Sequence, residues 1–131
     1  MVDIVFLLRR RPEMPAEEFH RYWREQHGPL VASLADTLNI RRYAQLHTLD
    51  TPLTEALRDS RDCEPMHFDG VALVSFESVE SLGAAVTTPG GATASDALLD
   101  DERRFLDLER CAIWFADHHD VIAPSGSTPK T

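Results

Sequence analysis

The stretch EEFHRYWREQHGPLV, residues 17–31, places its large apolar side chains three or four positions apart. At 100° per residue such side chains fall on one face of a helix, with charged residues outside it. The spacing predicts an amphipathic helix over about residues 15–37. Its apolar face holds Phe19, Trp23, His27, Leu30, Leu34 and Leu38. Because Pro29 has no backbone N–H, we expect the helix to kink or break locally at Gly28-Pro29.

Apolar runs rich in β-branched and aromatic residues predict strands on either side of this helix. The predicted strands are residues 2–9, 40–49, 71–78 and 111–122. Two further helices are predicted, over residues 78–86 and about 96–109, with TTPGGATAS (87–95) as a mobile loop between them. Residues 50–66 carry prolines and many charges, and we expect a long loop there with one short helical turn.

The resulting order, β-α-β-β-α-β, predicts an α+β fold of the ferredoxin-like kind. Right-handed crossovers on this order give a four-stranded antiparallel sheet with the helices on one face. We expect one domain over residues 1–122 and a disordered tail over 123–131, which lacks core-forming residues. The strands are apolar on both faces, so a homodimer that buries two sheets face to face is the expected consequence.

The net charge of the chain limits the kinds of molecule that it is expected to bind. The chain has 131 residues and a formal net charge of −9, which argues against nucleic acid and against an anionic membrane surface. The first residues have the wrong order of charge and apolar character for a signal peptide, and their apolar run is too short to cross a bilayer. With only Cys63 and Cys111 and no secretion signal, we expect a cytoplasmic protein with reduced thiols.

Four blocks, taken in order, closely resemble the EthD family. They are FHRYWREQHGPLV at 19–31, IRRY at 40–43, FDGVA at 68–72 and DExxFLD at 101–107. The helical F-x-x-Y/W-W-x-x-x-H-x-P-L core is the most specific of these, and the resemblance extends over about residues 3–122.

The resemblance implies a dimeric α+β barrel, in which two ferredoxin-like subunits join through their sheets. It also implies a pocket between sheet and helices for an aromatic or polyketide-like substrate. Relatives in that superfamily include polyketide cyclases, anthrone-type oxygenases, decarboxylases and muconolactone isomerases, many of which need no cofactor. EthD itself accompanies an ether-degrading oxygenase system. Membership of such a superfamily predicts the fold more sharply than the reaction.

His27 is the strongest candidate for chemistry. It lies on the apolar helix face, it matches the family's motif histidine, and its imidazole can exchange a proton near neutral pH. The alternative is a structural histidine that packs on Trp23 or caps carbonyls freed by Pro29. Tyr43 matches the tyrosine of IRRY and can donate a hydrogen bond to a phenol or enolate oxygen. Its alternative is a strand aromatic that pairs across the sheet.

Five further residues are candidates for binding substrate. Phe19 and Trp23 are expected to form an apolar wall, and His47 shares a strand face with Tyr43 about 13 Å along it. His67 closes the long loop. Asp69 matches the family's Asp-Gly and can orient a histidine, although a turn residue is the simpler account. His20, at the edge of the helix face, is expected to point to solvent.

The sequence gives no reason to expect a metal or a cofactor. It contains no H-E-x-x-H, Cys-x-x-Cys, G-x-G-x-x-G or P-loop motif. We therefore expect a small cofactor-independent enzyme that acts on an aromatic, polyketide-like or lactone substrate by proton transfer next to a carbonyl, as in cyclisation, isomerisation or decarboxylation. Two alternatives are a non-catalytic protein that binds a hydrophobic metabolite for a partner oxygenase, and a cofactor-free anthrone-type oxygenase.

Overall fold

A computed structural model of the chain describes residues 1–65 and 67–123. Its sheet has four antiparallel strands, and their spatial order is β2-β3-β1-β4. The strands are β1 (Val2–Leu8), β2 (Arg42–His47), β3 (Gly70–Phe76) and β4 (Ala112–Asp117). This is the topology of the ferredoxin-like plait, so the predicted fold class is confirmed. The expected tail lies almost wholly outside the described residues.

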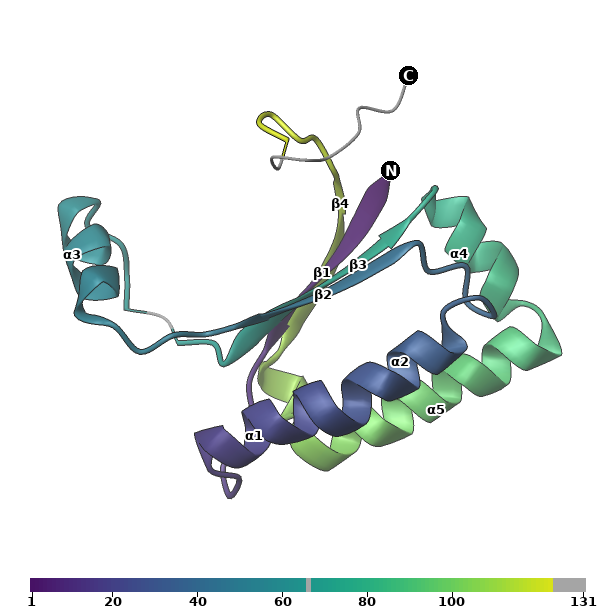
Figure 1. Cartoon of the computed structure of the whole chain (residues 1–131), viewed down its shortest axis with the longest axis horizontal. Helices are drawn as coiled ribbons and strands as arrows, with labels where there is room; N and C mark the ends of the chain where they lie inside the picture. Colours follow the sequence, from purple (N-terminus) through teal and green to yellow (C-terminus); the bar gives the residue numbers. More distant parts are fainter. Residues whose placement is uncertain (66, 124–131) are drawn as a thin grey trace.

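The helices form one layer against one face of the sheet (Figure 1). They are α1 (Ala16–Tyr22), α2 (Gly28–Leu34), α4 (Val79–Val86) and α5 (Pro89–Phe105). Helix α3 (Pro52–Ser60) lies apart from this layer and projects beyond the end of the sheet. It occupies the segment expected to be a long loop with one helical turn. A 3₁₀ turn, Leu108–Arg110, precedes β4.

The predicted long helix is present but changes its hydrogen-bond pattern in the middle. Between α1 and α2, residues Trp23–His27 form a π-helical turn, and the Gly28 N–H bonds to the carbonyl of Trp23. Pro29 follows at once and has no N–H to offer the α-helical ladder, so the expected interruption takes this form. Beyond the turn, Val31 is buried where the regular spacing favours Leu30.

The expected loop over residues 87–95 is wrong, because α5 begins at Pro89. Proline suits a first helical position, where its missing N–H costs nothing, and the Thr88 hydroxyl accepts a hydrogen bond from Gly91 N–H as the helix cap. Gly91 also permits a close turn, since a Cβ there would lie 1.8 Å from the Ala85 carbonyl oxygen. Pro-Gly-Gly at residues 89–91, which usually interrupts a helix, therefore begins one in this protein.

The core lies where the π turn, the start of β3 and the end of α5 meet. Its central members are Leu8, Phe19, Trp23, Ala72, Phe105 and Leu106. Gly70, at the start of β3, faces the indole of Trp23 so closely that a Cβ would come within 2.5 Å of the ring. The opposite face of the sheet is covered by no helix in the described part of the chain. Within that part, no helix is both long and apolar enough to span a bilayer.

Candidate functional site

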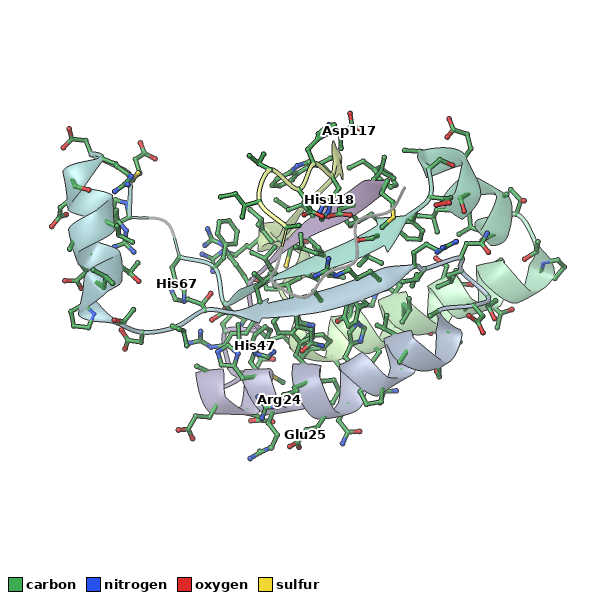
Figure 2. The ribbon with its side chains drawn as sticks, turned by 45° about the horizontal axis from the view of Figure 1, so that its top comes forward. Arg24, Glu25, His47, His67, Asp117 and His118 are labelled. Atoms are coloured by element: carbon green, nitrogen blue, oxygen red, sulfur yellow. The ribbon has the colours of Figure 1, made fainter. Side chains whose placement is uncertain are left out.

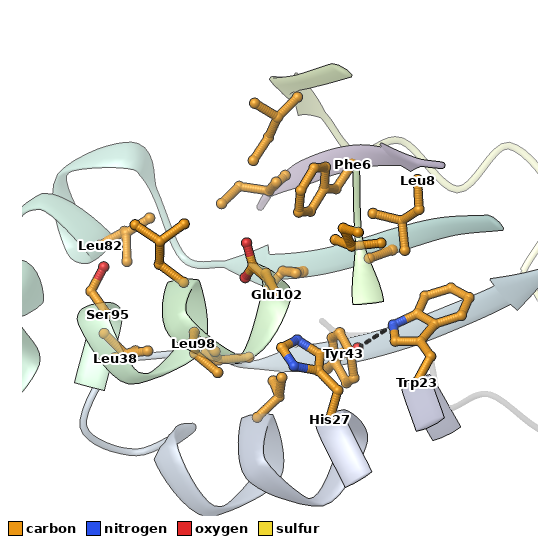
Figure 3. Close-up of a pocket in the computed structure, with 18 of the residues that line it drawn as sticks. Phe6, Leu8, Trp23, His27, Leu38, Tyr43, Leu82, Ser95, Leu98 and Glu102 are labelled. Carbon is orange, nitrogen blue, oxygen red and sulfur yellow. Dashed lines mark hydrogen bonds between the residues drawn. The ribbon is translucent and has the colours of Figure 1, made fainter. Parts of the chain in front are cut away.

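A cavity of about 340 Å³ lies between the sheet and the helices. It is bounded by residues of all four strands on one side and by the π turn, α2, α4 and α5 on the other. Most of its lining is hydrocarbon, supplied by residues such as Phe6, Leu98 and Phe105. Ionisable or hydroxyl groups reach it from four side chains, His27, Tyr43, Ser95 and Glu102, and Figure 3 shows them around the space.

His27 is held at the cavity wall by a carboxylate behind it. Its Nδ1 lies 2.7 Å from Oδ2 of Asp101, whose other oxygen accepts a hydrogen bond of 2.5 Å from the Tyr22 hydroxyl. Because a carboxylate only accepts, Nδ1 of a neutral His27 carries the proton and Nε2 carries the lone pair. Nε2 hydrogen-bonds to no residue in the described part of the chain, and the ring that carries it lines the cavity (Figure 3).

The charge state of His27 follows from its surroundings. The residue is only 5% exposed, and burial lowers its pKa, while the hydrogen bond and charge of Asp101 oppose this in part. The imidazole is therefore neutral at neutral pH and has a basic nitrogen directed at the cavity. This arrangement suits a general base whose orientation is fixed by a second residue.

Tyr43 enters the cavity from β2 and is fixed by two donors. Its hydroxyl oxygen accepts a hydrogen bond of 3.1 Å from the Trp23 indole N–H and one of 3.0 Å from the Gln45 amide. The same amide donates to the Trp23 carbonyl in the π turn. With both acceptor positions taken, the Tyr43 hydroxyl can only donate its own proton. Burial raises the pKa of Tyr43, so it stays protonated.

The orientation of Gln45 is in turn fixed by two histidines. Its carbonyl oxygen lies 2.9 Å from Nε2 of His47, and Nδ1 of His47 lies 2.7 Å from Nδ1 of His20. One proton lies between the two Nδ1 atoms. Burial lowers the pKa of both rings, and the charge of His20 adds to this for His47. His20 is therefore not the solvent-facing residue expected, because it packs against the second strand.

Glu102, which follows Asp101 in α5, projects into the cavity (Figure 3). No donor in the described part of the chain hydrogen-bonds to its carboxyl group. Burial, with a smaller effect from the negative charge of Asp101, raises its pKa to about 7. Neither acidic residue was among the predicted site residues. A signal existed for Glu102, which is spaced four after Leu98 and three before Phe105 and so lies on the apolar stripe of its helix.

The cavity brings together three of the seven predicted site residues, His27, Tyr43 and Trp23. Phe19 is fully buried in the core behind Trp23. His47 supports Gln45 and packs against Trp23 with its ring tilted by 39° and the ring centroids 4.3 Å apart. Both lie outside the cavity lining.

His67 and Asp69 also lie away from the cavity. The His67 side chain is 70% exposed and is 3.4 Å from Asp69, which forms an ion pair with Arg10. Figure 2 shows His67 and His47 toward the end of the sheet from which α3 projects. The geometry gives Asp69 the role of holding the end of β1, through Arg10, rather than orienting a histidine at the cavity.

The described residues contain no group of three or more histidines, cysteines or carboxylates arranged to hold a metal ion. Both cysteines are free thiols, with Cys63 exposed and Cys111 half-buried.

Comparison with known proteins gives a family and a fold. The family model for the EthD domain matches residues 11–109. A crystal structure of an ethyl tert-butyl ether D (EthD) family protein from Bacillus halodurans is similar, with a TM-score of 0.60 and 17% identity over 91% of this chain and 99% of that one.

Two other solved structures share the fold. A dimeric protein of unknown function with a ferredoxin-like fold, from Bacteroides fragilis, gives a TM-score of 0.56 and 13% identity over 89% of this chain and 95% of that one. A variant of SnoaB, a cofactor-independent oxygenase from Streptomyces nogalater, gives a TM-score of 0.50 and 14% identity over 98% and 97% of the two chains.

Proposed function

The chain belongs to the EthD family, and from this membership and the cavity geometry we propose that it is an enzyme that moves a proton next to a carbonyl group without a cofactor. The substrate is a small aromatic or polyketide-like molecule. The reaction is of the cyclase, isomerase or decarboxylase type. His27 acts as the base, and Tyr43 stabilises the oxygen on which negative charge develops.

The observation that carries this proposal is the Asp101–His27 pair. Asp101 fixes the imidazole with Nδ1 protonated, and Nε2 faces an apolar space. A neutral imidazole in such a space can take a proton from a carbon acid, and Asp101 stabilises the imidazolium that forms. The alternative, in which His27 only packs on Trp23 or caps carbonyls freed by Pro29, does not use the buried hydrogen bond between Asp101 and His27.

Tyr43 supplies the complementary group. Its hydroxyl is restricted to donating, so it can bind a carbonyl oxygen and bind the enolate more strongly as charge grows. A substrate must therefore present a carbonyl or phenol oxygen to Tyr43 and an acidic C–H to His27. These two requirements describe an enolisable ketone.

The size of the cavity limits the substrate to a few rings. A volume of about 340 Å³ is near the lower end of the range for ligand pockets, and roughly twice the ~150 Å³ cavity that holds benzene. One or two fused rings fit this space.

A cofactor-free oxygenase is the second candidate, favoured by the likeness to SnoaB, which is described as a cofactor-independent oxygenase. Proton removal by His27 would also start that reaction, because the carbanion of an anthrone-type substrate is what meets dioxygen. Oxygen uptake by the purified protein, with the two-ring phenol 1-naphthol as substrate and no flavin or metal added, separates the two. A third candidate, a carrier of hydrophobic metabolites for an oxygenase, binds the ketone stoichiometrically without converting it.

We also propose that two copies of the chain pair through the uncovered sheet face. Side chains there alternate with those that line the cavity, and Leu46 and Trp114 remain about half exposed on it. Related structures of this fold are described as dimeric. A second copy would remove these side chains from water.

The test uses α-tetralone, a bicyclic ketone with an acidic C–H, dissolved in heavy water. The protein should exchange the hydrogens next to the carbonyl for deuterium, followed by NMR, and His27→Ala should abolish the exchange without loss of folding or of the dimer. His119→Ala, which removes an exposed histidine, is the matched control. Equal exchange by the His27→Ala protein would refute the assignment.

A further inference from the structure

Glu102 is the one ionisable group in the cavity that the proposed proton abstraction leaves without a role. It lies on the stripe of α5 that carries Leu98 and Phe105, and its carboxyl group has no hydrogen-bond partner among the described residues. Burying a carboxyl group in a hydrocarbon lining without a partner costs stability. A residue retained there for structure alone would be expected to be paired, as Asp101 is with His27 and Tyr22.

The titratable groups near Glu102 are Asp101, which precedes it on α5, His27 and Tyr43, which line the same cavity, and the Cys111 thiol before β4. Asp101 disfavours a second negative charge, and burial does so more strongly, which raises the pKa of Glu102 to about 7. Burial has the opposite effect on His27, whose pKa it lowers. Near neutral pH the cavity thus holds a carboxylic acid with a proton to give and an imidazole ready to take one.

We infer that Glu102 is the general acid of this cavity, and that with His27 it selects β-hydroxy ketones of one or two rings, from which the protein removes water. The inference rests on the proposed function, since it needs His27 as the base. It adds the identity of the acid and the class of substrate.

The reaction balances without an oxidant or reductant. His27 Nε2 takes a proton from the carbon next to the carbonyl, and the C–H electron pair forms the enolate, whose oxygen accepts the Tyr43 hydrogen bond. The enolate electrons then form a C=C bond toward the β-carbon, and the C–O bond to the β-hydroxyl breaks. Glu102 protonates the departing oxygen, so that water leaves. A proton returned from His27 to Glu102 by way of solvent restores both residues.

The test compares two probes on the same proteins. Deuterium exchange of α-tetralone needs only the base, whereas conversion of β-hydroxy-α-tetralone to α-naphthol and water needs the acid as well. Glu102→Gln should slow the dehydration by about 10²-fold or more, a far larger factor than its effect on the exchange. Glu80→Gln, which alters an exposed glutamate on α4, should leave both rates unchanged.

The pH profile separates an acid from a structural residue. Dehydration by the unaltered protein should fall as pH rises through about 7, because the carboxyl group loses the proton it must give. Glu102→Gln should lack this fall in its residual activity, and Glu102→Asp, which keeps a carboxyl group, should retain it.

Three results would overturn the inference while leaving the proposed function standing. One is exchange without any protein-dependent dehydration. Another is dehydration by Glu102→Gln at the unaltered rate. The third is an equal loss of exchange and dehydration in Glu102→Gln, which would show that Glu102 acts through His27. Failure of the proposed function looks different, because α-tetralone exchange would then be absent or insensitive to His27→Ala.

Discussion

Replacement of Glu102 by glutamine should flatten the dependence of stability on pH. The carboxyl group has an ordinary pKa of 4.5, and burial raises it to about 7 in the folded protein. At 1.36 kcal/mol per pH unit, this difference corresponds to about 3 kcal/mol. That is a large share of the 5–15 kcal/mol typical of a domain.

The sign follows from proton binding. Between pH 4.5 and about 7 the folded state keeps the Glu102 proton and the unfolded state loses it. The folded state therefore binds more protons, and the free energy of unfolding falls as pH rises. The contribution of Glu102 is fully present below pH 4.5 and is lost as pH rises through about 7. Glu102→Gln cannot titrate, so this part of the loss should be missing from the variant.

Urea unfolding followed by tryptophan fluorescence measures the effect, at one fixed protein concentration because assembly contributes to stability. Between about pH 4.5 and pH 8, the unaltered protein should lose about 3 kcal/mol more than Glu102→Gln, and Glu80→Gln should lose as much as the unaltered protein. All three proteins contain His27 and the other titrating groups, so the contributions of those groups cancel when the losses of unfolding free energy are compared. Equal losses in the unaltered and Glu102→Gln proteins would refute the reasoning and place the carboxyl group in contact with water.

Three other perturbations test separate parts of the structure. Asp101→Asn should lower the rate of α-tetralone exchange by about 10²-fold or more, because an amide does not fix the His27 tautomer. An unchanged rate would show that the Asp101–His27 pair has no part in the exchange. Gly70→Ala should destabilise the fold by about 1–3 kcal/mol in urea, since the new Cβ would lie 2.5 Å from the Trp23 ring. Trp114→Glu should convert the proposed dimer to a monomer in light scattering, and a dimer that persists in the variant would place the interface elsewhere.

The strands and the long helix could be predicted because their patterns are local. Alternating or continuous apolar runs mark the four strands, and the crossover rules then leave one arrangement. The start of α5 could not, since Pro89 and the following glycines are usual helix breakers. Their role here depends on the Thr88 cap and on the close approach of Gly91 to α4. These are contacts between segments, which a single-segment pattern does not contain.

The site was predictable only in part for a similar reason. His27 and Tyr43 lie on faces that the helix and strand periods identify, and both line the cavity. Asp101 sits in an acidic run that a sequence pattern assigns to solvent, and its pairing with His27 of the π turn requires two helices to be packed. Glu102 carried a signal only in its place on the apolar stripe of its helix. His47 lies on the predicted side of the sheet but at the end covered by the first helix, so its position along the strand excludes it from the cavity.

The π turn at Trp23–His27 makes the position of His27, the proposed base, depend on how many residues the turn contains and not only on which residues they are. In an uninterrupted α-helix each four-residue step rotates a side chain about 40° further round the axis, so Phe19, Trp23, His27 and Val31 would drift away from a common face. The π turn holds more residues than an α-helical turn, so it keeps these side chains on a common face. Deleting the exposed Gln26 would alter no wall residue and would still swing the following segment round by about 100°. A relative with the same motif letters but one residue fewer would therefore present a different side chain to its cavity, which makes the spacing itself a marker of the site.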